Sequence, residues 1–232
     1  MIVAITGASK GLGKAFAAQF AAAGHTLLLC ARNRVSLEAT AKALQQQFSS
    51  ATIHTLEADM SNKQEVLAFA AWCLRMGVPD VLINNAGQFI PGSVWNEEEG
   101  LLEAMIETNL YSAYHLTRAL LPNMMERESG HIFNICSIAS LQAYANGGSY
   151  SISKFAMLGF SKNLREEMKP YNIKVTSVMP GAAYTDSWSG SGVDPERIME
   201  ADDVAKMVYA ASLLSPQACV EDIVLRPQLG DL

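Results

Sequence analysis

The sequence has 232 residues, 50% of them hydrophobic and 17% charged, so it can bury a large core and fits one α/β domain over residues 1–232. Its formal net charge is -6 and it has no cluster of five basic residues, which argues against nucleic acid and anionic lipid surfaces as partners. It contains no long apolar run, and a first strand is expected from Ile2, so we expect a cytoplasmic protein with no membrane span and no leader.

Strands and helices are expected to alternate from the first residues onward. An apolar run at 2–5, a glycine-rich turn, a helical repeat ending at Gly24 and a second apolar run at 26–31 form a strand, helix, strand unit. Further helices are expected at about 36–48, 63–75, 99–110, 111–127, 149–168 and 202–212, and further strands near 52–57, 80–87, 131–137, 173–180 and 219–226. This order predicts a Rossmann-like, doubly wound, seven-stranded parallel sheet with helices on both faces.

One stretch does not fit this alternation. Residues 181–200 contain glycine, serine and proline without strand or helix periodicity. A connection of this length is too long for an ordinary loop of an α/β domain. We therefore expect a substrate lid or a disordered loop at about 181–200.

The cysteines and histidines are scattered along the chain. The four cysteines form no CxxC pair, and the four histidines show no ligand spacing with them. We expect reduced thiols and no metal site.

The segment TGASKGLGKA at residues 6–15 fits three glycine-loop chemistries. As GxSxG it would place Ser9 as the nucleophile of a hydrolase. Such a hydrolase needs a catalytic histidine late in the chain, but no histidine follows His131, and the sequence has no HGGG-type oxyanion segment. As a phosphate loop it has Ala8 in place of the first glycine and Ala15 in place of the magnesium-binding hydroxyl. As TGxxxGxG it is a dinucleotide turn, whose glycines let the backbone approach a pyrophosphate at a helix N-terminus. The third interpretation fits best.

Tyr150 and Lys154 lie four residues apart in a stretch expected to be helical. Residues at this spacing share a helix face, so the Lys154 ammonium is expected to favour the phenolate and lower the pKa of Tyr150 from its usual value of about 10. The pair predicts a phenol that works as an acid near neutral pH. The alternative is a chance pair on a helix.

Taken together, these motifs resemble the short-chain dehydrogenase/reductase family. TGASKGLG is similar to its TGxxxGxG, NNAG at 84–87 to its fourth-strand motif and YSISK to its YxxxK. Asn109, Ser137 and the segment 180–185 follow in the family's order. The resemblance spans residues 1 to about 186.

The resemblance implies a catalytic set of Asn109, Ser137, Tyr150 and Lys154. Tyr150 would protonate a carbonyl oxygen as hydride arrives from the nicotinamide, and Lys154 would hold the nicotinamide ribose. Ser137 would hydrogen-bond the substrate oxygen, and Asn109 would hold a water that relays protons from Lys154. Taken alone, Ser137 also fits a strand-end cap and Asn109 a helix break; the Tyr150 and Lys154 pair decides for the catalytic interpretation.

The resemblance also implies a cofactor site, with Asp59 binding the adenine and residues 85–87 lining the cofactor at the end of the fourth strand. The implied cofactor-binding residues are Gly7, Ser9, Lys10, Gly11, Leu12, Gly13, Arg32, Asp59, Asn85, Ala86, Gly87, Tyr150, Lys154, Pro180, Gly181 and Thr185.

Charge indicates which dinucleotide is preferred. An NAD enzyme of this architecture ends its second strand with a carboxylate for the ribose hydroxyls, but here Ala31 is followed by Arg32. Arg32 offers a partner to a 2′-phosphate, and Lys10 adds a second cation on the same side, with Asn33 and Arg34 as further polar candidates. We expect NADP(H). The alternative is that both cations are simply solvated.

The substrate is less closely defined. The candidate pocket residues are mostly apolar: Gln88, Phe89, Ile138, Tyr144, Met179, Tyr184 and Trp188. Arg197 in the lid is either a carboxylate clamp or a solvated loop residue. The ending IVLRPQLGDL resembles a branch that includes hydroxy-amino-acid dehydrogenases and pterin reductases. We therefore expect a small, largely apolar or hydroxy-amino-acid-like carbonyl or alcohol.

Two further expectations concern the class of protein and its assembly. A non-catalytic NADP-binding sensor or scaffold of the same fold is the alternative to an enzyme, and the complete catalytic set argues against it. In the family, the helix of Tyr150 and the helix of His115 form a four-helix interface. The apolar content of both segments therefore predicts a homodimer or homotetramer.

Overall fold

The computed structural model describes residues 1–185, 188 and 192–231. Within these residues seven strands, all paired in parallel, form one sheet in the order β3-β2-β1-β4-β5-β6-β9. The strands are β1 Ile2–Thr6, β2 Thr26–Ala31, β3 Thr52–Glu57, β4 Val81–Asn84, β5 Gly130–Ile135, β6 Ile173–Pro180 and β9 Asp222–Leu225. The predicted seven-stranded parallel sheet is confirmed.

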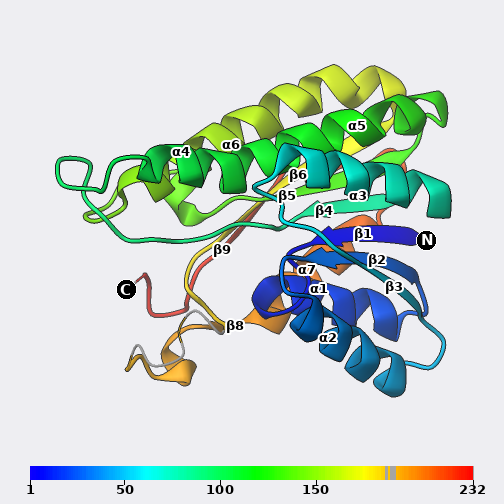
Figure 1. Cartoon of the computed structure of the whole chain (residues 1–232), viewed down its shortest axis with the longest axis horizontal. Coiled ribbons are helices and arrows are strands. Elements are labelled where there is room, and N and C mark those ends of the chain that lie inside the picture. Colours follow the sequence, from blue (N-terminus) through cyan, green and yellow to red (C-terminus); the bar gives the residue numbers. More distant parts are fainter. Residues whose placement is uncertain (186–187, 189–191, 232) are drawn as a thin grey trace.

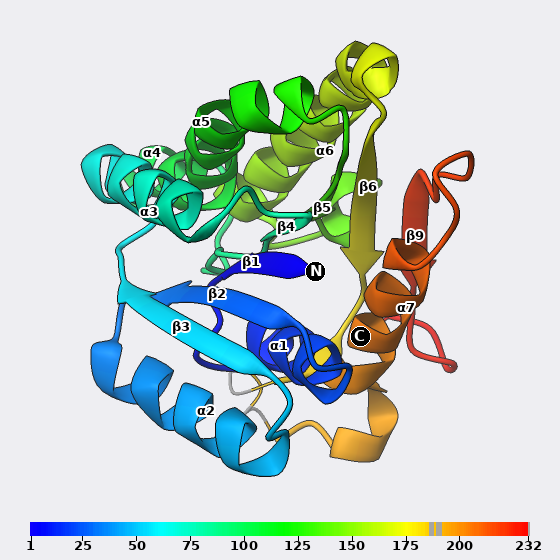
Figure 2. The same cartoon turned by 90° about the vertical axis from the view of Figure 1, so that its right-hand side faces the viewer.

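Helices cover both faces of this sheet, as predicted (Figures 1 and 2). One face carries α1 Gly11–Ala22, α2 Arg34–Gln47 and α7 Ala201–Ser212. The other carries α3 Lys63–Met76, α4 Leu101–Ile106, α5 Ser112–Glu126 and α6 Gly148–Met168. No helix in the described part of the chain combines the length and apolarity needed to cross a membrane.

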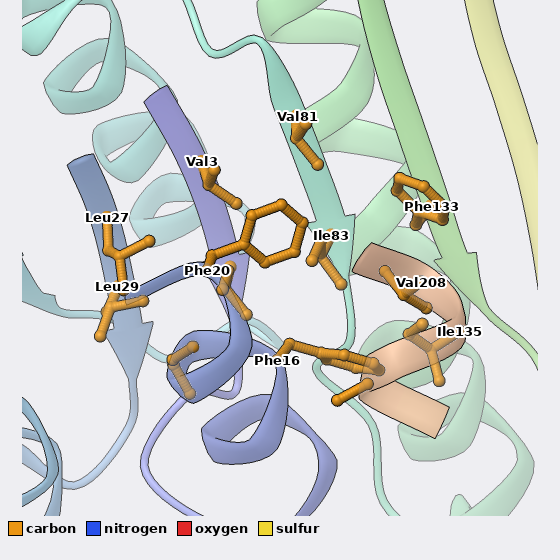
Figure 3. Close-up of a cluster of buried hydrophobic side chains, with 14 of the residues drawn as sticks. Val3, Phe16, Phe20, Leu27, Leu29, Val81, Ile83, Phe133, Ile135 and Val208 are labelled. Atoms are coloured by element: carbon orange, nitrogen blue, oxygen red, sulfur yellow. The ribbon is translucent and has the colours of Figure 1, made fainter. Parts of the chain in front are cut away.

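The central strands β1, β2 and β4 are almost entirely apolar because both faces of the sheet are buried there, whereas the edge strands β3 and β9 are partly exposed. In β1, Val3 and Ile5 belong to the core on the α1 face, whereas Ala4 belongs to the core on the opposite face. On the α1 face, Phe16 and Phe20 lie one helical turn apart and pack against the sheet together with Val208 of α7 (Figure 3). This packing fixes α1, and with it the glycine-rich turn that precedes it.

The helical region before β5 differs from the prediction. Instead of separate helices at 99–110 and 111–127, one nearly continuous stretch runs from α4 into α5 through a π-helical turn, η1 Glu107–Tyr111. Asn109 lies within this turn and is buried. Such π-bulges are frequent at functional sites because they turn a side chain out of the regular helical register.

The C-terminal region also corrects the expected boundaries. The last strand is shorter than the predicted 219–226 and spans only β9. The predicted lid contains a short parallel pair, β7 Ala183–Tyr184 with β8 Met199–Glu200, and a 3-10 turn at Pro195–Arg197. Residues 186, 187 and 189–191 of this segment lie outside the described residues. The lid is thus anchored by regular structure at both of its ends.

The order of the strands in the sheet indicates where a ligand-binding site is expected. β1 has β2 on one side and β4 on the other, so the chain reverses its direction of winding there. In open parallel sheets, ligands bind beyond the carboxyl ends of the strands at this switch point. The turns after β1 and β4 are therefore expected to form one site, together with the residues that follow β2 and β5.

Candidate active site

The glycines of the turn between β1 and α1 let its backbone pack closely against neighbouring backbone. Gly7 has a φ of 64°, a left-handed conformation that favours glycine. A Cβ on Gly13 would overlap the carbonyl oxygen of Gly7, so only glycine lets α1 begin this close to the turn. A Cβ on Gly11 would lie 3.3 Å from Thr185, which brings the start of the predicted lid over the same turn.

The end of β4 is hydrogen-bonded to this turn. The Thr6 hydroxyl accepts the backbone N–H groups of Asn85 at 2.9 Å and of Ala86 at 2.8 Å. The Asn85 side-chain amide donates to the carbonyls of Thr6 at 2.8 Å and Gly7 at 3.2 Å. Sequence reasoning did not single out Thr6. The signal in the sequence was the hydroxyl of a threonine at the end of an otherwise apolar strand.

The start of α1 presents its N-terminus at this edge. Lys10 occupies the N-cap position with extended backbone, and its side chain is exposed. The carbonyl of Ser9 accepts the Thr40 hydroxyl at 2.8 Å, which ties the turn to α2, and Leu12 packs against the core. The N–H groups of the first turn and the helix dipole favour an anion at this position.

The polar residues after β2 divide into two groups. Asn33 caps α2 by accepting the N–H of Ser36 at 2.9 Å, and Arg34 pairs with Glu38 at 2.6 Å on the exposed surface. Both are therefore engaged within α2. Arg32 is exposed directly after Ala31, so it and Lys10 remain the cations predicted for a 2′-phosphate.

Asp59 lies after β3 and is half-buried. Burial raises the pKa of its carboxyl, but hydrogen bonds from the Ser61 N–H and hydroxyl, with the charge of Arg32, outweigh burial and lower it overall. Asp59 is thus ionised and its Oδ1 is held by Ser61. Its expected contact with an adenine remains a prediction.

Asn109 holds the segment that leaves β4. Its Oδ1 accepts the N–H of Gln88 at 2.8 Å, and its Nδ2 donates to the Gln88 carbonyl at 3.0 Å and to Ser153 Oγ at 2.9 Å. A Cβ on Gly87 would lie 3.2 Å from Asn109 Oδ1 and 3.6 Å from Lys154 Nζ. Asn109, Gly87 and Lys154 therefore meet at one point, and Ser153, which the sequence did not single out, joins them.

Tyr150 and Lys154 lie on one face of α6, as their spacing predicted. The Lys154 ammonium is 5.8 Å from the centre of the Tyr150 ring. It donates a hydrogen bond at 2.9 Å to the carbonyl of Ile135, the last residue of β5. This bond holds the buried cation beside the strand end.

The predicted pKa effect of this pair is wrong. Burial raises the pKa of the Tyr150 phenol, and the neighbouring Ser137 hydroxyl only partly opposes this. Burial also lowers the pKa of the Lys154 ammonium. Desolvation of the phenol, which the sequence does not reveal, therefore sets the direction of the pKa shift. Tyr150 is protonated at neutral pH and holds a proton that it can donate.

Ser137 follows β5 and is buried. Its Oγ accepts the N–H of Ala139 at 3.1 Å, and its own N–H donates to Ser140 Oγ at 3.2 Å, so it caps a short 3-10 turn at Ile138–Ser140. The capping role that the sequence allowed is therefore present. It fixes the hydroxyl next to the Tyr150 phenol.

Pro180 ends β6, and the residues after it reach the glycine-rich turn. The N–H of Gly181 donates to the carbonyl of Leu225 at 2.8 Å, and Thr185 lies close enough to Gly11 that an added Cβ there would be 3.3 Å from it. The structure thus brings the segment 180–185 to the same edge as the other predicted cofactor residues.

The residues predicted to line the substrate pocket differ in where their side chains lie. The Phe89 ring meets the Tyr150 ring edge-on, with centroids 4.8 Å apart and planes at 80°. Tyr144 and Tyr184 are exposed and Ile138 is half-buried. Met179 was wrongly expected in the pocket: it is 1% exposed and packs in the core. Its strand position was near the site, but its side chain points into the core.

Arg197 also departs from both expectations. Its guanidinium donates to the carbonyls of Leu229 at 3.4 Å, Gly230 at 3.0 Å and Asp231 at 3.2 Å. It is neither a carboxylate clamp nor simply solvated. It joins the predicted lid to the C-terminal segment.

Comparisons with known proteins concern the chain as a whole. Residues 1–194 match the family described as short chain dehydrogenase. The chain is 36% identical to the sepiapterin reductase of Chlorobaculum tepidum over 100% of this chain and 98% of that one. The chain therefore belongs to the short-chain dehydrogenase/reductase family, as the motifs predicted.

Two solved structures share the fold over nearly the whole chain. An alcohol dehydrogenase from the archaeon Thermococcus sibiricus, complexed with 5-hydroxy-NADP, has a TM-score of 0.89 at 28% identity and covers 98% of this chain and 96% of its own. The serine dehydrogenase from Escherichia coli has a TM-score of 0.83 at 28% identity and covers 98% of both chains. The full-length matches indicate similarity throughout the fold, including its C-terminal helix and strand.

Proposed function

We propose that this protein is an NADP(H)-dependent oxidoreductase that transfers hydride between the cofactor and the carbonyl or secondary alcohol carbon of a small molecule. The observation that carries the proposal is the meeting of Asn109, Ser137, Tyr150 and Lys154 at the sheet edge that also holds the glycine-rich turn. A purely NADP-binding sensor needs no phenol with a neighbouring cation and hydroxyl. The presence of all three groups argues against the sensor alternative.

Each residue of this set has a defined task. The Tyr150 phenol, protonated at neutral pH, donates its proton to the substrate carbonyl oxygen. The fixed Ser137 hydroxyl donates to the same oxygen and stabilises the negative charge that develops there. Asn109 would hold a water that relays protons between Lys154 and bulk solvent, and both residues lie next to Gly87. The bound nicotinamide supplies or accepts the hydride.

The glycine-rich turn would hold a dinucleotide pyrophosphate at the N-terminus of α1. The absence of side chains at Gly7 and Gly13 lets the turn pack closely against α1 and the end of β4, which supports this assignment. Arg32 and Lys10 would bind the 2′-phosphate, and the neutral Ala31 lacks the carboxylate that an NAD enzyme places there. Several similar structures were solved with NADP or NADPH, which supports the same choice here.

The substrate class follows from the surroundings of Tyr150. Phe89 lies against its ring, and Tyr144 and Ile138 offer further apolar surface. Sepiapterin reductase at 36% identity favours a ketone next to a planar ring, whereas the serine dehydrogenase at 28% favours a hydroxy-amino acid. We propose the carbonyl beside a flat, largely apolar group as the first candidate and the hydroxy-amino acid as the second.

A single panel tests these assignments. NADPH consumption is followed with sepiapterin, aromatic and aliphatic diketones and aldehydes, and NADP+ reduction is followed with serine. Turnover of a ring-bearing ketone supports the first candidate, and turnover of serine alone supports the second. If NADPH binds without turnover of any carbonyl or alcohol, the sensor alternative stands instead.

We propose further that the chain is one domain with a lid at 181–200, and that it forms a homodimer or homotetramer through α5 and α6. Ile152 and Phe155 on α6 are 42% and 45% exposed, and Tyr111 before α5 is 48% exposed. Ile152 and Phe155 lie on α6, and Tyr111 lies in the π-helical turn that leads into α5; the counterparts of α5 and α6 form the family's four-helix interface. A monomeric mass by light scattering at micromolar concentration would contradict this assembly.

A further inference from the structure

The segment 88–100, between β4 and α4, lies against the segment that precedes α6. Ser93 Oγ donates to Asn146 Oδ1 at 2.9 Å, and the Gly92 N–H donates to the Asn146 carbonyl at 3.1 Å. Figure 1 shows the two loops side by side at the end of the molecule where α4 and α6 begin. The contact joins residues about 50 positions apart in the sequence.

Glu97 makes the strongest contact between these segments. Its Oε1 accepts the N–H of Ser149 at 2.8 Å, and its Oε2 accepts the Ser149 hydroxyl. Ser149 is 1% exposed and is the second residue of the 21-residue helix α6. A carboxylate at a helix N-terminus is stabilised by the helix dipole, and charge-assisted bonds sheltered from water are stronger than neutral ones. A Cβ on Gly148 would overlap the carboxylate, so glycine makes room for it.

The same segment reaches the catalytic tyrosine. Ser149 immediately precedes Tyr150, and Phe89 at the start of the segment lies against the Tyr150 ring. Between Phe89 and Glu97 the segment buries little surface, since Val94 is 73% and Trp95 is 85% exposed. A loop with so few buried apolar contacts depends on its hydrogen bonds to stay in place. Glu97 therefore anchors one end of a segment whose other end contacts the catalytic ring.

We propose that Glu97 is a positioning residue that holds segment 88–97 as the substrate-facing wall beside Tyr150, and so sets the affinity for substrate. Glu97 acts through Ser149 and Phe89. The proposal rests on the proposed function, because Phe89 forms a substrate wall only if Tyr150 is the acid. The glycine-rich turn, Arg32 and Asp59 follow β1, β2 and β3, and among the described residues no contact of Glu97 reaches them, so NADPH affinity is expected to change little when Glu97 is replaced.

Steady-state kinetics of three variants test this role. In Glu97→Ala the KM for the best panel substrate is expected to rise about tenfold, with kcat within about threefold and NADPH affinity within about twofold of wild type. Glu97→Gln keeps an acceptor for the Ser149 N–H but lacks the charge. Its KM should therefore lie between that of wild type and that of Glu97→Ala. Glu98→Ala removes the same charge from the exposed neighbouring residue and should match wild type. Equal KM in Glu97→Ala and wild type, or an equal rise in Glu98→Ala, overturns the proposal.

Hydrogen exchange tests the anchor separately from turnover. The amides of 88–97 and of Ser149 should exchange faster in Glu97→Ala than in wild type or Glu98→Ala. Unchanged exchange overturns the proposal, as does a uniform increase across the chain. If no panel substrate is turned over by wild type, the proposed function fails while exchange still decides whether Glu97 holds the segment. If Glu97→Ala does not fold, Ser149→Ala, which removes only the hydroxyl donor, is measured in both assays with the same expected directions.

Discussion

Asn109 and Tyr150 are connected through one buried hydroxyl. The Asn109 amide donates to Ser153 Oγ at 2.9 Å, and Ser153 donates in turn to the backbone carbonyl of Tyr150 at 2.7 Å. Ser153 is fully buried. The π-helical turn that carries Asn109 is thereby fixed to the helix that carries the phenol.

This connection predicts the effect of Ser153→Ala. Loss of one buried hydroxyl that bridges two site residues should lower kcat about three- to tenfold, with the affinity for NADPH within about twofold. The matched control is Ser151→Ala, because Ser151 bonds the carbonyl of Ala139 instead and lies outside the connection. A kcat in Ser153→Ala equal to that of Ser151→Ala would show that the bridge does not position the site.

The parts of the site predicted from sequence are those formed by local spacing. Gly7, Gly11 and Gly13 predict a glycine-rich turn because they lie within seven consecutive residues. Tyr150 and Lys154 share a face because α6 is a regular helix. The strand and helix order predicted the sheet for the same reason, since apolar periodicity is a local property.

The parts that were missed depend on contacts between distant residues. Thr6 bonds the backbone 79 and 80 positions away, and Glu97 bonds Ser149 52 positions away, so neither partner is visible in a local pattern. The pKa of Tyr150 was predicted in the wrong direction because burial is set by tertiary packing. Met179 was misplaced because nearness in sequence to the site does not show which way its side chain points.

His131 predicts how stability depends on pH. It is 5% exposed, its Nε2 lies 2.7 Å from Thr176 Oγ1, and burial lowers its pKa from 6.5 to about 3. Between these values the unfolded chain binds a proton that the folded protein does not, so stability falls as pH falls below 6.5. We expect this residue to account for about 2 kcal/mol of lost unfolding free energy at about pH 5.

Denaturant unfolding at about pH 7 and about pH 5, at one protein concentration, measures this effect in wild type and in His131→Gln, which cannot be protonated. The variant should lose less stability than wild type on acidification, even if it is less stable at neutral pH. The same loss in both proteins would assign the pH dependence to other groups.

Gly13→Ala tests the glycine-rich turn. The added methyl group would overlap the carbonyl of Gly7, so α1 must move away from the turn. We expect NADPH affinity to fall at least about tenfold and the melting temperature to fall, because the displaced backbone faces the pyrophosphate. NADPH affinity is measured by fluorescence titration. If Gly13→Ala binds NADPH as tightly as wild type, the pyrophosphate does not bind at this turn.

Arg32 is the residue proposed to set the preference for NADPH over NADH. If its guanidinium binds the 2′-phosphate, Arg32→Ala should weaken NADPH binding about ten- to a hundredfold and leave NADH binding nearly unchanged. Arg32→Asp should narrow or invert the preference, because its carboxylate repels the phosphate and offers a partner to free ribose hydroxyls. Arg34→Ala is the matched control, since Arg34 already pairs with Glu38. Equal wild-type affinities for NADH and NADPH, or an NADPH affinity that neither Arg32 substitution changes, would end this assignment.

The central claim is that the partly buried Tyr150 phenol is the acid in a hydride-transfer reaction. Tyr150→Phe removes only the hydroxyl, so the ring contact with Phe89 and the position of Lys154 can persist. The decisive measurement is the rate of NADPH oxidation by wild type and Tyr150→Phe with the best carbonyl substrate, alongside a titration of NADPH binding. The account predicts near wild-type binding and a rate lower by about 10² to 10⁴. A variant that keeps more than about a third of the wild-type rate, well above that general-acid loss, would show that Tyr150 is not the acid.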